Sequence, residues 1–371
     1  MPMRIVIAGG SVGGLFAAEL LRRAGHDVTV YERSTSGLEG RGAGLVAQRE
    51  VFAMLREAGV EHVAQFGVEA HERIVLDRDG EVVHRQATPQ TQLSWDRLFR
   101  VFRERVPDGG YVGGRTVAGV TQDMQRATVH FADGGAEEAD LVIAADGLGS
   151  TLRGLVAGAG SLPAYAGYVA WRGLVPETAM PTQAAARLFE RFAFYDIPRS
   201  QVLGYLVPGA DGAIEPGRRR YNWVWYRRYT PEELIGVLTD ADGQRHDFSL
   251  APGQMRPAAA DVLRADAARL LPPAFAAAVA AEPLPFVQAI FDYATPRMVA
   301  GRLVLIGDAA FVARPHTAMG VAKVAGDAFA LRDALVGQPD VPAALAAFER
   351  VRLLHGQAVV DYGRRLGASF D

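Results

Sequence analysis

The sequence of 371 residues contains no cysteine. Disulfides, cysteine-ligated metals, thiolate nucleophiles and cofactors attached through cysteine are therefore excluded. The sequence also lacks an uninterrupted apolar run of about 18 residues, the length that a membrane-spanning helix requires, and glycines interrupt its apolar N-terminal stretch, which argues against a signal peptide. With a formal net charge of −3, it has no basic excess of the kind that nucleic-acid-binding proteins carry. We therefore expect a cytoplasmic protein without a metal site and with neither nucleic acid nor membrane as a partner.

Hydrophobic residues make up 49% of the sequence and charged residues 22%, which is ordinary for a folded globular protein. The length suits two domains that share an interface, although one large α/β unit is the alternative. Two arginine clusters, at 218–220 and 227–228, have two interpretations. We favour solvated strand ends over contacts to the phosphates of a transient nicotinamide nucleotide.

A β-α-β pattern opens the chain. Residues 3–8 form a short apolar strand, residues 13–24 have helical periodicity, and residues 26–32 form a second strand that ends at Glu32. The strand-to-helix turn, GGSVGG, is weak by itself, but with a carboxylate 18 residues after Gly14 it predicts dinucleotide binding, with the phosphates at the helix N-terminus. The residues expected there are Gly9, Gly10, Ser11, Val12, Gly13, Gly14, Glu32 and Arg33.

Three later loops have the small residues that a flat ligand needs. RGAGLVAQ spans 41–48, ADG ends a buried strand at 145–147, and GDAAFVARPHTAMGV at 307–321 follows a buried strand over 303–306. The last loop is the most informative because it lies at the carboxyl edge of the sheet, where ligands bind. Each loop taken alone also fits an ordinary turn. The cofactor-binding residues expected in them are Arg41, Gly42, Ala43, Gly44, Leu45, Gln48, Asp146, Gly147, Gly307, Asp308, Pro315, Ala318, Met319, Gly320 and Val321.

The middle of the chain differs from both ends. Residues 72–88 form a predicted hairpin, and residues 162–230 are aromatic-rich alternating strands, as in an antiparallel sheet with one covered face. Helices are expected over 259–280, 323–336 and 341–368. The dinucleotide-type elements are therefore split around a β-rich insertion.

In their order along the chain, the GGSVGG turn with Glu32, the Asp146-Gly147 turn and the Gly307-Asp308 loop resemble the motifs of the flavin monooxygenases related to para-hydroxybenzoate hydroxylase. The resemblance covers essentially the whole chain. It implies an α/β fold: a Rossmann-like FAD-binding domain of the glutathione reductase type, an inserted antiparallel β-sheet substrate domain, and C-terminal helices. The domains expected are a discontinuous FAD-binding domain (1–72, 95–160 and 285–335), a substrate domain (73–94 and 161–284) and a C-terminal helical segment (336–371).

The resemblance also implies the chemistry. FAD is the cofactor, NAD(P)H is a transient co-substrate, and dioxygen forms a flavin hydroperoxide that hydroxylates a small electron-rich aromatic or heteroaromatic ring. Within the family, the strings YAGYVAWRG and RPHTAMGVAK are similar to those of dihydroxypyridine hydroxylases. A homodimer is an expectation that rests on the resemblance alone. A flavin oxidase or reductase without oxygen insertion, and a non-catalytic redox sensor, stay open as alternatives.

His316 is the candidate catalytic residue, because the resemblance places its loop at the reacting edge of the flavin. It would bond the ring oxygen of the substrate or carry its proton; the alternative is that it only satisfies backbone groups of its loop. Aromatic and basic residues of the β-rich insertion are candidates for the substrate wall, although half of the side chains of any strand point away from it. The substrate-binding residues expected are Tyr168, Arg172, Tyr195, Tyr205, Trp223 and His316, with Trp225 as a further candidate.

Overall fold

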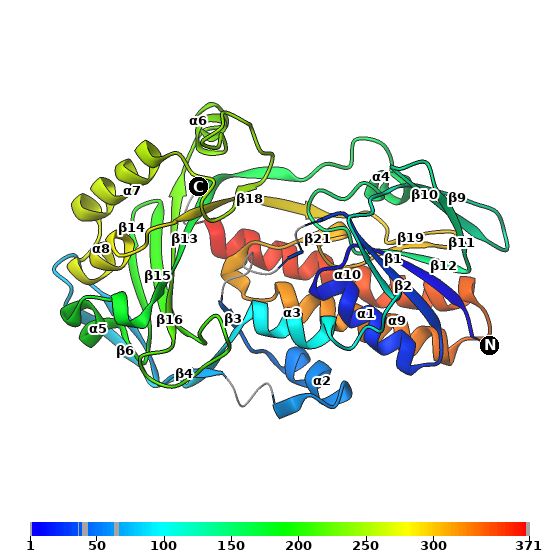
Figure 1. Ribbon diagram of the computed structural model, residues 1–371, viewed down its shortest axis with the longest axis horizontal. Coiled ribbons are helices and arrows are strands. Elements are labelled where there is room, and N and C mark those ends of the chain that lie inside the picture. The colour runs from blue at the N-terminus through cyan, green and yellow to red at the C-terminus, as the bar shows by residue number, and fades with distance from the viewer. Residues whose placement is uncertain (1, 36, 39–43, 63–66, 369–371) are drawn as a thin grey trace.

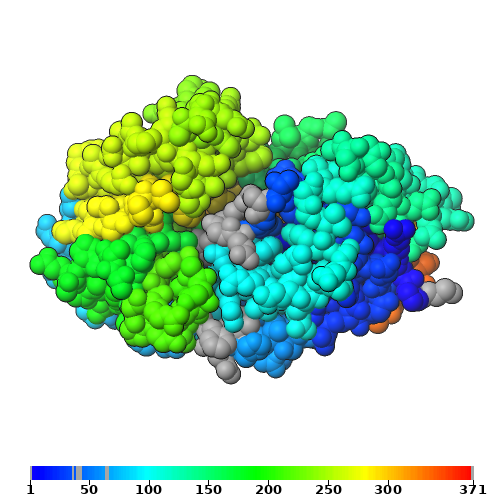
Figure 2. Space-filling model, in the orientation of Figure 1, coloured from blue at the N-terminus to red at the C-terminus, as the bar shows by residue number. Residues whose placement is uncertain are grey.

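The computed structural model describes residues 2–35, 37–38, 44–62 and 67–368. Figure 1 shows two bodies side by side: a parallel sheet with helices, and a large sheet built mainly from the middle of the chain, in which all pairings except β14–β5 are antiparallel. Figure 2 shows the same division on the surface, with the green and yellow middle of the chain on one half. None of the described helices is long and apolar enough to cross a membrane.

The parallel sheet has the strand order β19-β20-β12-β1-β2-β8, and all its pairings except β19–β20 are parallel. Its central strands are short apolar runs that are almost fully buried, as expected for a sheet covered on both faces. Its strands are β1 (Arg4–Ala8), β2 (Asp27–Glu32), β8 (Tyr111–Gly113), β12 (Leu141–Ala144), β19 (Val299–Ala300) and β20 (Leu303–Leu305). The helices of this body are α1 (Val12–Arg23), α2 (Arg49–Glu57), α3 (Trp95–Arg103), α4 (Arg153–Ala157), α9 (Gly320–Gly337) and α10 (Val341–Gly367).

The large sheet has the order β17-β18-β13-β16-β15-β14-β5-β6, and β21 pairs with β18. One face packs on α5 (Thr182–Leu188), α7 (Pro257–Leu270) and α8 (Pro273–Ala280) and forms a core of its own. The other face looks toward the parallel-sheet body. The strands are β5 (Glu72–Leu76), β6 (Val82–Gln86), β13 (Ala164–Pro176), β14 (Arg191–Ile197), β15 (Ser200–Val207), β16 (Arg220–Arg228), β17 (Ser249–Leu250), β18 (Phe286–Ala294) and β21 (Phe311–Val312).

Two smaller sheets complete the fold. One has the order β3-β7-β4, from β3 (Gly44–Val46), β7 (Gln90–Ser94) and β4 (Val68–Ala70), and it packs on the inner face of the large sheet. The other consists of β9 (Val117–Gln122), β10 (Ala127–Phe131) and β11 (Ala136–Ala139). Further helices are α6 (Pro231–Val237) and the 3-10 turns η2 (Glu177–Ala179), η3 (Gly307–Ala309) and η4 (Pro315–Thr317).

The expected β-α-β unit and the β-rich insertion are both present, but one expected boundary is wrong. Residues from 285 onward were expected to belong to the cofactor domain, whereas β18 pairs with β13 and β17 inside the large sheet. An apolar nine-residue strand suits either sheet, so its sequence does not reveal its partner.

Candidate functional site

The turn between β1 and α1 is built for close backbone contact. Gly9 has a φ of +108°, which L side chains rarely adopt, and a Cβ on Gly9 would overlap the carbonyl oxygen of Ala145. A Cβ on Gly14 would in turn overlap the carbonyl oxygen of Gly9. Ser11 is the N-cap of α1, and its side chain makes no cap hydrogen bond within the described chain. The first N–H groups of the helix therefore face the adjoining cleft and can receive an anion.

Glu32 stands at the end of β2 as expected, and it is buried. Its Oε2 accepts from the backbone N–H of Gly10 at 2.8 Å, and its Oε1 accepts from that of Ser34 at 2.8 Å. These two bonds fix the carboxylate between the glycine turn and the loop that follows β2. Because each carboxylate oxygen has a second lone pair, both can still accept from a ligand hydroxyl.

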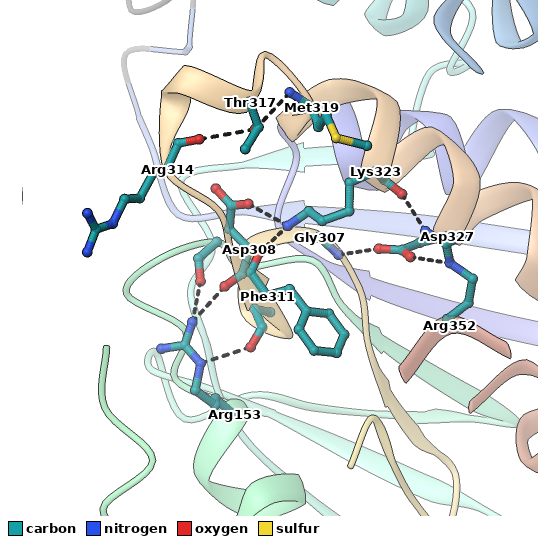
Figure 3. Close-up of polar contacts among 12 residues, drawn as sticks. Arg153, Gly307, Asp308, Phe311, Arg314, Thr317, Met319, Lys323, Asp327 and Arg352 are labelled. Carbon is teal, nitrogen blue, oxygen red and sulfur yellow. Dashed lines mark hydrogen bonds and ion pairs between the residues drawn. The ribbon is translucent and has the colours of Figure 1, made fainter. Parts of the chain in front are cut away.

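Arg153 joins the two loops that follow β12 and β20 (Figure 3). The guanidinium donates from Nε to the carbonyl of Ala309 at 2.8 Å and from Nη2 to that of Asp308 at 2.7 Å, and on the other side it donates to Leu148 and Gly147. Beside it, Asp146 accepts through Oδ2 from two backbone N–H groups, while its buried Oδ1 has no partner among the described residues. An unsatisfied acceptor at this position is what a ligand hydroxyl or N–H would satisfy.

Lys323 of α9 holds the Gly307-Asp308 turn from the opposite side (Figure 3). Its side chain is 0% exposed, and its Nζ donates to Asp308 Oδ1 at 2.9 Å and to the carbonyl oxygen of Phe311. One turn further along α9, Asp327 accepts from the N–H of Gly307 at 2.9 Å and from Arg352 Nε at 2.7 Å. The turn is thus fixed by buried charges, while the side chain of Asp308 remains 51% exposed.

These loops line two adjoining pockets that together form a cleft. One end is bordered by Glu32, Arg33 and Arg115, and the other by Trp95, Asp308, Gly320 and Val321. Ser11, Ala145 and Gly147 border both parts. Phe248, Ser249 and Gln288 of the large-sheet body close one side. A long ligand with a sugar at one end, phosphates at the α1 N-terminus and a polyol near Asp308 fits this set of donors and acceptors, and FAD has these groups in that order.

The loop before α9 is shaped for a flat group. Ala318 has a φ of +52° and a ψ of 18°, in the left-handed region that a non-glycine residue seldom adopts, and its side chain is exposed. Its carbonyl accepts from Gln48 Nε2 at 2.8 Å, so two expected cofactor residues from distant loops meet here. Gly44 and Leu45 lie in β3 close by in sequence; Arg41, Gly42 and Ala43 lie outside the described residues.

His316 lies where this loop meets the inner face of the large sheet. Its Nε2 is 2.9 Å from the hydroxyl oxygen of Tyr168, and its ring centroid is 4.2 Å from that of Tyr226. Burial, together with the smaller effect of the nearby positive charge of Arg314, lowers the pKa of His316 to about 4. Arg314 itself forms a buried double ion pair with Asp292 and lies 5.5 Å from the Tyr168 ring. At neutral pH this imidazole is uncharged.

The expected substrate wall divides between the two faces of the large sheet. Tyr168, Arg172 and Tyr205 share the inner face with Tyr226, because they alternate along β13, β15 and β16 in the observed register. Tyr195, Trp223 and Trp225 point to the opposite face and pack in the core under α5 and α8. Those three are therefore not brought to the site, and the sequence offered no signal for which set of alternating residues faces inward.

Three site features were missed from the sequence. Two of them lie beside the cofactor cleft, Lys323 and Trp95, and the third is the pair Asn222 and Tyr226 on the inner face of β16, where Tyr226 contacts His316. Of these, Lys323 has the clearest signal in the sequence, because it is the only lysine in the chain and follows Gly320 by three residues.

Comparison with known proteins agrees with this geometry. A family model described as FAD binding domain-like matches residues 165–292. The chain is 32% identical to 2,6-dihydroxypyridine 3-monooxygenase of Paenarthrobacter nicotinovorans over 98% of this chain and 91% of that protein. It is 28% identical to 6-hydroxynicotinate 3-monooxygenase of Bordetella bronchiseptica, over 88% of this chain and 80% of that protein.

Solved structures give the same result for the fold. The structure of 2,6-dihydroxypyridine-3-hydroxylase from Arthrobacter nicotinovorans superposes with a TM-score of 0.93 at 31% identity, over 100% of this chain and 93% of that chain. HpxO of Klebsiella pneumoniae, complexed with FAD and uric acid, superposes with a TM-score of 0.78 at 24% identity, over 98% and 88% of the two chains.

Proposed function

This chain belongs to the FAD-dependent aromatic monooxygenases, and on that premise we propose that it hydroxylates a small hydroxylated aromatic or heteroaromatic ring held between His316 and the inner face of the large sheet. When bound, FAD would accept electrons from NAD(P)H and supply the transfer of one atom of dioxygen to the ring. What the chain supplies is binding, orientation, exclusion of water and control of one proton.

The observation that carries the proposal is the contact between Tyr168 and His316. Burial raises the pKa of Tyr168, so its hydroxyl stays protonated and can donate to Nε2 of a neutral imidazole. We assign the hydrogen of that imidazole to Nδ1, which leaves Nε2 able to accept from Tyr168. A histidine fixed in this tautomer can orient the oxygen of a ring hydroxyl. A histidine that only bonded its own loop would not need this contact with Tyr168.

The residues around this contact suit an aromatic ligand. Tyr226 and Tyr168 supply ring faces. Arg172 lies near Tyr205 and Tyr226, where its positive charge opposes the rise in tyrosine pKa that burial causes. The same charge would favour the deprotonated, more nucleophilic form of a hydroxylated ring.

The cofactor-binding assignments are part of this proposal. Ser11 and the α1 N-terminus would hold the pyrophosphate, Glu32 the adenosine ribose, and Asp146 and Asp308 the remaining hydroxyls. Gly44, Leu45, Gln48 and the segment from Pro315 to Val321 would border the ring system. The supporting observations are the unsatisfied Oδ1 of Asp146 and the two adjoining pockets, which are lined by Ser11, Glu32, Asp146, Asp308, Gly320 and Val321.

The test uses the full chain loaded with FAD and then desalted. Hydroxylated benzenes and hydroxypyridines are screened for ring-dependent NAD(P)H oxidation under ¹⁸O₂, and each product is weighed by mass spectrometry. The expected result is one oxygen-18 atom per product molecule. Product without oxygen-18 would indicate an oxidase, and NAD(P)H oxidation that no ring accelerates would indicate a redox sensor; either result overturns the proposal.

A further inference from the structure

The small sheet β3-β7-β4 faces the inner side of the large sheet across Tyr205. The Tyr205 hydroxyl donates to the carbonyl of Gly44 at 3.2 Å, and a Cβ on Gly44 would lie 2.7 Å from the Tyr205 ring. Gly44 pairs with Ser94, and Val46 pairs with Gln92. Because side chains alternate along a strand, Gln92 shares the face that Gly44 turns toward Tyr205.

Asn222 stands on the other side of the same interface. It pairs directly with Tyr205 across β15 and β16, so both point from the inner face of the large sheet. Asn222 is two residues from Val224 and four from Tyr226, the ring that contacts His316. Arg172 pairs with Val224, which places it on the same face between Asn222 and Tyr226.

Gln92 and Asn222 are both 0% exposed, yet the amide nitrogen and oxygen of each lack a hydrogen-bond partner among the described residues. The Nε of Arg172 is likewise buried and unsatisfied. Buried polar atoms without partners cost folding free energy and are rare, so several at one interface indicate a ligand that satisfies them.

We infer that Gln92 and Asn222 select the substrate of the proposed hydroxylation, and that this substrate is a nitrogen heterocycle with a lactam edge, in which a ring N–H adjoins a carbonyl. Each amide offers donors and an acceptor, so together they need a ligand that both donates and accepts. A hydroxypyridine in its pyridone form has such an edge. A benzoate offers only acceptors in its carboxylate, which leaves both amide oxygens unpaired, and a plain phenol offers a single hydroxyl.

The test rests on binding rather than turnover. FAD-loaded, oxidised protein is titrated anaerobically, without NAD(P)H, with 2,6-dihydroxypyridine and with resorcinol, which differ at one ring position, and the change in flavin absorbance gives each Kd. The variants are Asn222→Leu and Gln92→Met, which keep size and remove the amide. Tyr221→Phe is the matched control, since it removes an unsatisfied buried hydroxyl from the opposite face of the same strand.

We expect the parent to bind the heterocycle at least about tenfold more tightly than resorcinol. Resorcinol has no lactam edge, so its binding would leave polar atoms of the two amides without hydrogen bonds. Each amide variant should weaken heterocycle binding by about tenfold and resorcinol binding by less than about twofold. The melting temperature of ligand-free protein should not fall, because an unsatisfied group has been removed. Tyr221→Phe should leave both Kd values unchanged.

Equal affinity of the parent for the two rings would overturn the inference, as would variants that keep the preference or that only lower the melting temperature. Asn222→Asp, which loses the donor and keeps the shape, replaces Asn222→Leu if that variant does not fold, and it should also reduce the preference. Oxygen-18 incorporation into a carbocyclic ring with no preference for the heterocycle would refute this inference and leave the proposed function standing. Failure of every ring to bind or react would refute both.

Discussion

At the scale of single residues, the low pKa of His316 decides between its two possible roles. Burial and the positive charge of Arg314 both disfavour an imidazolium at this position, and the pKa falls to about 4. A net proton transfer from a ring hydroxyl to such a group is unfavourable at neutral pH. We therefore expect His316 to hydrogen-bond the ring oxygen as a neutral imidazole and not to hold its proton.

A pair of substitutions at His316 tests this role. Glutamine keeps a neutral hydrogen-bonding amide in place of the imidazole, so His316→Gln should keep kcat within about tenfold of the parent, whereas His316→Leu should lower it by about a hundredfold or more. The kcat/KM of His316→Gln should keep the parental pH profile between pH 6 and 9, measured by ring-stimulated NAD(P)H oxidation. Equal loss of activity in both variants would mean that the histidine must carry a proton.

The same shift in pKa predicts how stability depends on pH. Below about pH 6.5 the unfolded chain protonates this histidine, while the folded protein does so only near pH 4, so His316 makes the protein less stable as the pH falls from 6.5 to 4. The free energy of unfolding, measured in urea across this range, should therefore fall less steeply in His316→Gln than in the parent. His84→Gln on the exposed strand β6 is the control, and it should follow the parental slope. Parallel curves for parent and His316→Gln would contradict the assignment.

At the scale of elements, α9 acts as the support of the Gly307-Asp308 turn. Lys323 is the only lysine among 39 lysine and arginine residues, and its side chain is fully buried. A compact ammonium can donate to both the Asp308 carboxylate and the Phe311 carbonyl, where a planar guanidinium needs more space. Asp308 is thereby fixed at the edge of the cleft.

Lys323→Met should therefore weaken FAD binding. Losing the charged donor leaves two acceptors unpaired, and we expect the free energy of unfolding to fall by about 2 kcal/mol and the Kd for FAD to rise about tenfold. Fluorescence titration of the FAD-free protein gives the Kd, and urea unfolding gives the stability. Arg332→Met, on the same helix but in an exposed ion pair with Glu57, should change the Kd less than about twofold. An unchanged Kd in Lys323→Met would rule out this supporting role.

At the scale of the whole molecule, the cleft lies between two bodies with separate hydrophobic cores. Gly9, Ser11 and Asp146 line it from the parallel-sheet body, and Phe248 and Gln288 from the large-sheet body. The β18–β21 pairing and the buried Asp292–Arg314 ion pair also cross between them. A cofactor in this cleft contacts both bodies and should stabilise the molecule as a unit.

Addition of FAD should thus raise the melting temperature, and the rise should follow the logarithm of the FAD concentration above its Kd. At about 100 times its Kd, FAD should stabilise the fold by about 2.7 kcal/mol. FMN at the same concentration should stabilise it much less, because it lacks the adenosine that would reach Glu32 and Arg33. Thermal unfolding of FAD-free protein with each ligand checks this. An equal shift with FMN would show that the adenosine end of the cleft contributes no binding.

The sequence was sufficient for features that depend on local conformation and spacing. The apolar run of β1, the GGSVGG turn and Glu32 together predict the β-α-β unit, because strand length, glycine backbone freedom and helix periodicity are short-range properties. The resemblance of its motifs predicts the family and the cofactor. The ends of the two buried strands also predict that Asp146 and Asp308 lie at the carboxyl edge of a sheet.

Only the tertiary structure decided which side chains meet. From the alternation along β16, either Trp223 or Asn222 could face the site. Packing against α5 and α8 places Trp223 in the core and Asn222 on the inner face. The hydrogen bond from Arg153 to Ala309 joins residues that are 156 positions apart. Strand β18 pairs within the large sheet, although its residues were expected to belong to the cofactor domain. A strand or loop sequence specifies its own conformation, but burial against a distant partner is a property of both segments, and neither one encodes it alone.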